Sequence, residues 1–133
     1  MSHLKNKSNL SLKAAKHLES NTNYYNSTVH CAYYSCLQMT KYILEKEYQL
    51  QGELQANQGR GSHDYMLKRM RGIIKDNKGK RFNAIDYYEN CTELKTLRVN
   101  ADYNNIEILE TNAQEAIKFA DEVIRILTNN FSI

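Results

Sequence analysis

The stretch YYNSTVHCAYYSCLQMTKYILEKE, residues 24–47, decides the fold of this chain. Its apolar and small side chains recur at alternating steps of three and four residues, which is the spacing of one face of an α-helix. The residues of this face are Val29, Ala32, Tyr33, Cys36, Leu37, Thr40, Ile43 and Leu44, and Tyr34, Gln38, Met39 and Tyr42 widen it. A face this wide contacts neighbours on more than one side, so we expect the central helix of a bundle.

Amphipathic patterns on both sides of this stretch predict four more helices, at about residues 8–20, 64–75, 84–101 and 111–127. The chain has no proline, and all its glycines lie between residues 52 and 79, so the flanking segments lack helix breakers. We predict an all-α, up-and-down bundle of four or five helices, one domain over residues 1–133. The polar segment 50–62 is expected to be a flexible loop, and the tail from residue 129 to fray.

Composition narrows the class of protein. The net charge is only +3, so the chain as a whole is not a polycation. No apolar run approaches the roughly 18 residues that a membrane-spanning helix needs, and the first ten residues contain no hydrophobic signal region. We therefore expect a cytoplasmic protein. Its three cysteines form no CxxC pair, and we interpret Cys31, Cys36 and Cys91 as reduced thiols of the core.

The segment TELKTLRVNADY, residues 92–103, carries the strongest candidate site. Arg98 lies at the edge of a helical apolar stripe, and Asn100, Asp102 and Tyr103 follow it within five residues. A guanidinium near a helix end can present a planar fork of donors to a phosphate. The alternative is a structural ion pair between Arg98 and Asp102, which are spaced by four residues.

A basic cluster lies between residues 68 and 81 and includes Lys78, Lys80 and Arg81. Such a cluster is either a surface that follows a nucleic-acid backbone or an ordinary solvated face. The sequence has no glycine-rich phosphate loop, no HExxH or GxSxG motif, and no Cys/His metal spacing. We accordingly expect no cofactor and no metal.

Three segments occur in an order typical of one known family. They are NSTVHCAYYSCLQMTKYIL (residues 26–44), the Ser62-His63 pair, and LRVNADY (residues 97–103), which an Ala-rich helix, AQEAIKFADEVI (residues 113–124), follows. In these segments the chain resembles the HEPN family (higher eukaryotes and prokaryotes nucleotide-binding domain), over residues 8–127. The similarity is to its RxxADY-like variants.

The resemblance implies a four- or five-helix bundle that pairs as a homodimer. Active family members are metal-independent ribonucleases with an Arg-x(4–6)-His motif, and some are toxins that a small nucleotidyltransferase antitoxin neutralises. Arg98 matches the arginine of the motif, and Asn100 matches a polar position that follows it. By this resemblance the catalytic candidates are Arg98 and Tyr103. The candidate ligand-binding residues are Arg98, Asn100, Asp102, Tyr103 and His63, and the candidate nucleic-acid patch is Lys78, Lys80 and Arg81.

The motif histidine is missing, because the fifth residue after Arg98 is Tyr103 and all four histidines precede Arg98. At pH 7 a tyrosine is deprotonated in only about one part in a thousand, whereas a histidine is largely ready to accept a proton. General acid–base help is worth roughly 10²–10⁴-fold in rate. The favoured interpretation is therefore a homodimer that binds nucleotide or RNA phosphate with a degenerate motif. The alternatives are an active endoribonuclease and a non-catalytic interaction module.

Overall fold

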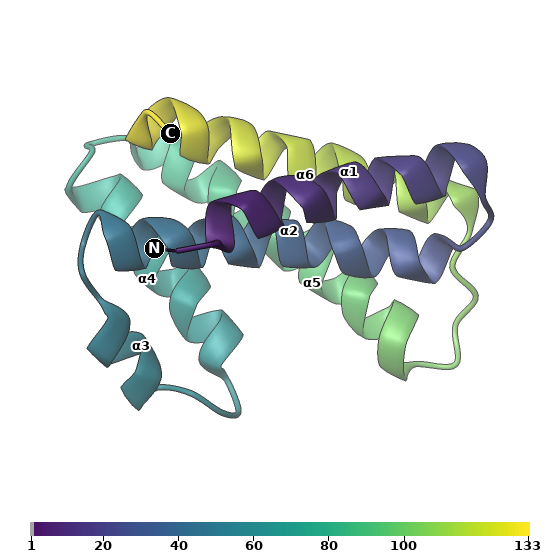
Figure 1. Ribbon diagram of the computed structural model, residues 1–133, viewed down its shortest axis with the longest axis horizontal. Helices are drawn as coiled ribbons and strands as arrows, with labels where there is room; N and C mark the ends of the chain where they lie inside the picture. Colours follow the sequence, from purple (N-terminus) through teal and green to yellow (C-terminus); the bar gives the residue numbers. More distant parts are fainter. Residues whose placement is uncertain (1) are drawn as a thin grey trace.

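A computed structural model describes residues 2–133 and shows six helices and no strand within them (Figure 1). The helices are α1 (Leu4–Asn21), α2 (Tyr25–Lys46), α3 (Gln51–Ala56), α4 (Ser62–Asp76), α5 (Arg81–Tyr103) and α6 (Glu110–Phe131). The predicted all-α bundle is confirmed. Every predicted helix is present, although most extend further at one or both ends than the apolar pattern indicated.

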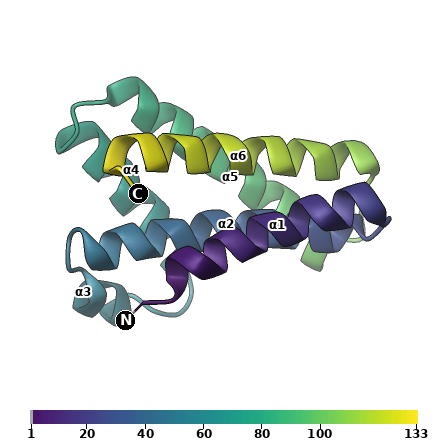
Figure 2. The ribbon, with the colours of Figure 1, turned by 45° about the horizontal axis from the view of Figure 1, so that its top comes forward.

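Helix α2 is the central element, as its sequence predicts. It packs against α1, α4, α5 and α6, and Figures 1 and 2 show it running between α1 and the α4–α5 pair. Contact on several sides buries the narrow apolar face together with Met39 and Tyr42, whereas Tyr34 and Gln38 are half-buried. The fully buried side chains of α2 include Val29, Tyr33, Met39, Ile43 and Leu44.

The segment 50–62 differs from the expected loop, because residues 51–56 form α3. Leu54 anchors this short helix in the core, and Glu53 accepts hydrogen bonds from Tyr65 and from Arg69 Nε, the latter at 3.1 Å. These partners come from α4, so the local composition of the segment did not reveal them. The expected mobility of the segment stays a prediction.

The C-terminal end also differs from expectation. Helix α6 continues to Phe131, beyond the residue where we expected fraying to begin. Phe131 is buried and packs edge-on against Tyr48, with ring centroids 6.1 Å apart. Burial of one aromatic ring is worth a few kcal/mol, which is enough to hold the last helical turn.

Helices α2 and α5 are joined by a buried polar contact in addition to apolar packing. The hydroxyls of Thr40 and Tyr87 lie 2.7 Å apart, and both residues are fully buried. All three cysteines are free. Cys36 and Cys91 lie in the core as expected, whereas Cys31 is only half-buried. Burial raises the pKa of the Cys91 thiol to about 12, so it stays protonated.

The connection between α4 and α5 sets the direction of α5. The α4–α5 turn is only four residues long, and Gly79 adopts a φ of 62°, a left-handed conformation that costs glycine little. Helix α5 therefore runs back along α4 and carries its last turns past the first half of α2 (Figure 1).

No helix of the described residues is both long and apolar enough to cross a membrane.

Candidate functional site

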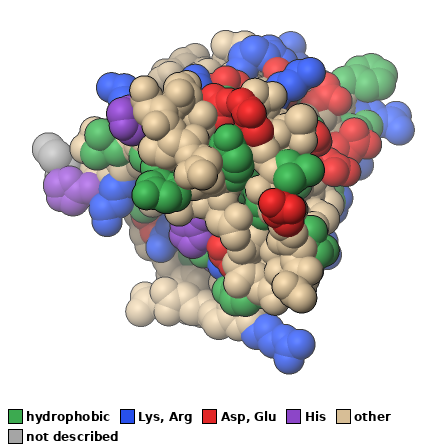
Figure 3. Space-filling view, turned by 90° about the vertical axis from the view of Figure 1, so that its right-hand side faces the viewer, with side chains coloured by type: hydrophobic (Ala, Val, Ile, Leu, Met, Phe, Trp, Pro, Cys, Tyr) green, Lys and Arg blue, Asp and Glu red, His purple; other side chains and the backbone are tan. Residues whose placement is uncertain are grey.

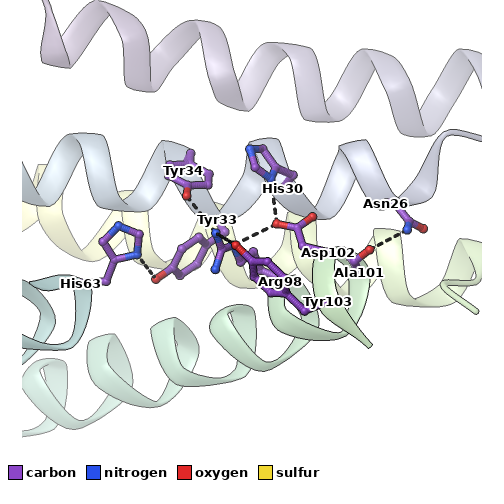
Figure 4. A network of polar contacts seen from close by, with 9 residues as sticks. All are labelled: Asn26, His30, Tyr33, Tyr34, His63, Arg98, Ala101, Asp102 and Tyr103. Atoms are coloured by element: carbon purple, nitrogen blue, oxygen red, sulfur yellow. Dashed lines mark hydrogen bonds and ion pairs between the residues drawn. The ribbon is translucent and has the colours of Figure 1, made fainter. Parts of the chain in front are cut away.

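Side chains from α2, α4 and α5 converge on the guanidinium of Arg98 (Figure 4). We call this group the Arg98 cluster, and it consists of His30, Tyr33 and Tyr34 from α2, His63 from α4, and Arg98, Asp102 and Tyr103 from α5. Asp102 lies on the same side of α5 as Arg98 because it is four residues further along the helix. Tyr103 is the last residue of α5, and its hydroxyl reaches Arg98 Nη2. The cluster thus arises where the last turns of α5 cross α2.

Each edge of the Arg98 guanidinium has a different environment. Nε lies 3.0 Å from Asp102 Oδ2, while Nη2 donates to the hydroxyls of Tyr34 at 3.1 Å and Tyr103 at 3.3 Å. The Nε contact is an ion pair rather than an aligned hydrogen bond, since the buried N–H is not directed at the carboxylate. The predicted pairing of Arg98 with Asp102 therefore forms, but it is one of several contacts that fix the guanidinium.

Aromatic rings surround the same group. The guanidinium carbon lies 5.0 Å from the ring centroid of Tyr103 and 5.7 Å from those of Tyr33 and Tyr34. These distances are within the range of cation–π attraction. Burial alone would lower the pKa of Arg98, but Tyr34, Tyr103 and Asp102 outweigh it and raise the pKa. The side chain, 14% exposed, is therefore a fixed and permanently charged group.

Asp102 connects the arginine to a histidine. His30 Nδ1 lies 3.1 Å from Asp102 Oδ2, the same oxygen that faces Arg98 Nε. A ring nitrogen beside a carboxylate carries the proton and donates it, which leaves the lone pair on Nε2. The His30 side chain is 48% exposed, and Nε2 has no partner within residues 2–133. Asp102 thus holds His30 with its basic nitrogen open to solvent.

His63 has the opposite arrangement. The pKa of the buried Tyr33 hydroxyl is raised, mainly by burial, so this group stays protonated, and the one acceptor it meets among the described residues is His63 Nδ1, at 3.2 Å. Tyr33 therefore donates to His63, whose proton must then sit on Nε2. Partial burial, helped by the charges of Arg98 and Lys95, lowers the pKa of His63. His63 is a neutral hydrogen-bond donor beside the arginine.

Two grooves flank the Arg98 cluster. One has a volume of about 340 Å³ and is lined by Asn26, Ser27, His30, Cys31 and Asp102. The other, of about 360 Å³, is bounded by α2, α3 and α4 and reaches His63. The two histidines therefore each border open space, on different sides of the arginine.

The structure brings together only part of the predicted site. Arg98, Asp102, Tyr103 and His63 meet as expected. The Asn100 side chain instead accepts a hydrogen bond from Asn104 Nδ2 at 2.8 Å, and it makes no hydrogen bond to the cluster. Arg81 begins α5, so it lies about 25 Å along the helix from Arg98. The predicted patch of Lys78, Lys80 and Arg81 is thus at the far end of α5.

Sequence reasoning missed His30, Tyr33 and Tyr34 as members of the site. His30 pairs with a residue 72 positions later, and Tyr34 with one 64 positions later. The available signal was their own spacing, because a polar histidine four residues before Tyr34 interrupts an otherwise apolar and aromatic helix face.

No group of three or more His, Cys, Asp or Glu side chains in residues 2–133 is arranged to hold a metal ion. In comparisons with known proteins, a family model described as HEPN domain matches residues 1–130 of the chain. The same comparisons found neither a curated protein nor a solved structure that matches this chain.

Proposed function

Because the chain belongs to the HEPN domain family, we propose that it is an RNA-binding helical module whose Arg98 cluster holds a backbone phosphate. The family match covers nearly the whole chain and supports a nucleotide- or RNA-related role for a helical domain. The phosphate role of Arg98 rests on the residues themselves.

The observation that carries this proposal is the free edge of the Arg98 fork. Nε faces Asp102 and Nη2 serves two tyrosine hydroxyls, whereas the two donors of Nη1 meet no acceptor in the described part of the chain. A guanidinium that is fixed on two edges and open on the third loses little conformational entropy when it binds an anion. Nη1 therefore supplies the contact to a phosphate oxygen, and the neutral His63 Nε2–H is a second donor nearby.

A basic groove supports an extended nucleic acid rather than a single nucleotide. It lies between α4 and α5, has a volume of about 430 Å³, and is lined by Lys68, Arg71, Lys75 and Arg81. The helical spacing of Arg81, Tyr88, Lys95 and Arg98 places them along one side of α5. A phosphate backbone bound in this groove runs along α5 toward Arg98, and this contact depends on salt rather than on base sequence.

We further propose that two chains pair through the end of the molecule that carries the Arg98 cluster. Large apolar side chains are exposed there, namely Tyr24, Tyr103, Ile106 and Leu109. In Figure 3, which faces this end, hydrophobic side chains emerge between acidic and basic ones. Met39, Tyr42 and Tyr87 are buried within the chain's own core and do not contribute to this exposed surface.

An endoribonuclease is the second candidate function, including the toxin of a pair with a nucleotidyltransferase antitoxin. The two histidines beside Arg98 favour it, since each borders a groove. The third candidate, a pure interaction module, leaves the open Nη1 edge and the basic groove without a role.

Replacing Arg98 by alanine tests the proposed function. A charge-assisted hydrogen bond is worth roughly 1.5–3 kcal/mol, so affinity for single-stranded RNA should fall by about ten- to a hundred-fold. Fluorescence anisotropy with a short 2′-O-methyl RNA measures binding alone, because this probe has no free 2′-hydroxyl and resists cleavage. Arg98→Lys should recover only part of the affinity, since an ammonium lacks the planar fork.

Arg125→Ala is the matched control for this experiment. Arg125 is an exposed arginine of α6 that pairs with Glu122, away from the Arg98 cluster, so its removal should leave the affinity unchanged. Equal affinities for the wild-type chain and Arg98→Ala, with both chains folded by circular dichroism, would refute the proposed role of Arg98.

A further inference from the structure

We propose that His30, held by Asp102, is the catalytic base with which this chain cleaves RNA. This inference rests on the proposed binding of an RNA phosphate by Arg98, and it assigns a reaction and a residue to the same site. The residue comes from α2, far in sequence from the LRVNADY segment where the motif histidine is missing.

The position of His30 provides what a base requires. Its Nδ1–H donates to Asp102 Oδ2 at 3.1 Å, so the lone pair is on Nε2, at the solvent-exposed edge of the ring. The ring also lies against Tyr34, with centroids 4.6 Å apart, and this contact limits its rotation. A carboxylate that fixes the tautomer and later stabilises the imidazolium is the arrangement that activates histidine bases in hydrolases.

One oxygen of Asp102 contacts both the proposed base, His30, and the proposed phosphate-binding residue, Arg98. Arg98 Nε and His30 Nδ1 lie 3.0 and 3.1 Å from the same atom, Asp102 Oδ2. A phosphate on the free Nη1 edge of Arg98 would therefore bind the side chain that shares this carboxylate oxygen with the imidazole. The groove of about 340 Å³ beside His30 and Asp102 offers space for the nucleotide that carries the attacked phosphate.

The contacts of the second histidine exclude it as the base. The lone pair on His63 Nδ1 accepts the Tyr33 hydroxyl proton at 3.2 Å, and its Nε2 carries a hydrogen. Tyr103, the other candidate, offers a phenol oxygen that already accepts a hydrogen bond from Arg98 Nη2. Among the members of the cluster, His30 alone presents an open, basic nitrogen.

The proposed cleavage step needs only side chains of the cluster and a water molecule to account for every proton and bond. His30 Nε2 takes the proton of a ribose 2′-hydroxyl, whose oxygen then bonds to the adjacent phosphorus. The bond from phosphorus to the 5′-oxygen of the next nucleotide breaks, and this oxygen takes a proton from a water molecule. The resulting hydroxide takes the proton from the imidazolium. The products are a 2′,3′-cyclic phosphate and a 5′-hydroxyl, and Arg98 Nη1 neutralises the charge that develops on the phosphate oxygens.

His30→Asn is the decisive variant, because the asparagine amide nitrogen takes the place of Nδ1 and can still donate to Asp102, whereas the basic Nε2 is gone. Cleavage of a 5′-labelled single-stranded RNA in EDTA should slow by roughly 10²–10⁴-fold. Affinity for the 2′-O-methyl probe should stay within about two-fold of the wild-type value. Mass spectrometry of the wild-type products should show the cyclic phosphate, and DNA of the same sequence should remain intact.

Two further variants complete the test. His17→Asn removes an exposed histidine of α1 that bonds only to Asn21, so cleavage should match the wild-type rate. Tyr103→His in the His30→Asn background restores a histidine within reach of Arg98 and should recover part of the lost rate, which a merely structural role of His30 would not allow.

The outcomes separate the two proposals. Binding without cleavage by the wild-type chain, or cleavage by His30→Asn at the wild-type rate, would overturn the role of His30 and leave RNA binding in place. Failure of the wild-type chain to bind the probe would overturn both.

Discussion

At the scale of single residues, the site depends on how one carboxylate and one hydroxyl fix the protons of two histidines. Asp102 directs a donor of His30 inward and leaves a basic nitrogen outside, whereas Tyr33 does the reverse to His63. Two chemically identical side chains thereby receive different roles from their partners. This difference is set by contacts between helices and leaves no trace in the local sequence around either histidine.

The lowered pKa of His63 makes a prediction for stability against pH. Its pKa is lowered from 6.5 in the folded chain, by burial first and by Arg98 and Lys95 second. As the pH falls below 6.5, the unfolded chain takes up this proton before the folded chain does. The contribution to stability is therefore complete above about pH 6.5 and is lost as the pH falls through the folded-state pKa.

Thermal unfolding at pH 7.5 and pH 5.5 measures this contribution. The drop in melting temperature between the two values should be smaller in His63→Asn than in the wild-type chain, because asparagine keeps an acceptor for Tyr33 but does not titrate. His17→Asn should show the full wild-type drop. An unchanged drop in His63→Asn would mean that the His63 pKa is not lowered.

At the scale of elements, α2 and α5 define the site by their crossing. The apolar faces fix their packing, and the Thr40–Tyr87 contact adds a directional link in the middle of the interface. The Asn26 side chain donates to the Ala101 carbonyl oxygen at 2.8 Å and so ties the start of α2 to the last turns of α5. The position of Arg98 is a consequence of these contacts.

The Thr40–Tyr87 contact predicts a non-additive pair of substitutions. Thr40→Val keeps the shape but leaves the buried Tyr87 hydroxyl with only the weak sulfur of Cys91 nearby, so the free energy of unfolding should fall by about 1–3 kcal/mol. Tyr87→Phe should cost less, because Thr40 can donate to a carbonyl of its own helix. In the double variant both polar groups are gone, and stability should exceed that of Thr40→Val. Urea denaturation checks all three, and additive effects would contradict the proposed coupling.

The elements also show which parts of the fold and of the site can be predicted from the sequence. The long helices were predictable because each must bury an apolar stripe, and the local spacing of residues such as Leu94 and Leu97 indicates this stripe. Helix α3 was not, since a segment of six residues depends on contacts that Glu53 and Leu54 make with distant elements. The Arg98–Asp102 pair was predictable from its spacing of four, whereas His30 and Tyr34 reach it only through the fold.

At the scale of the whole molecule, the site lies next to an exposed surface that carries the large apolar side chains Tyr24, Tyr103, Ile106 and Leu109. Tyr103 belongs to both, because its hydroxyl contacts Arg98 while the residue is 68% exposed. A second chain docked on this end would exclude water from one side of the cluster and strengthen its electrostatic interactions. Pairing and phosphate binding should therefore support each other.

Light scattering tests the pairing. The wild-type chain should give twice the 15.5 kDa mass of one chain at micromolar concentration. Replacing Ile106 and Leu109, which are 54% and 52% exposed, by glutamate should yield monomers, because a dimer interface cannot bury unpaired carboxylates. Leu10→Glu, at a comparably exposed position on α1, should leave the dimer intact. A wild-type monomer would exclude this interface.

The long chain separation within the Arg98 cluster has a consequence for how the protein is made. His30 and Asp102 are 72 residues apart, and a ribosome adds about 5–20 residues per second, so roughly 4–14 s pass between their syntheses. During this interval the nascent chain holds a histidine without its carboxylate and tyrosines without their arginine. The proposed cleavage site is thus incomplete while the chain is still being translated, and it forms only after α5 has been released and packed against α2.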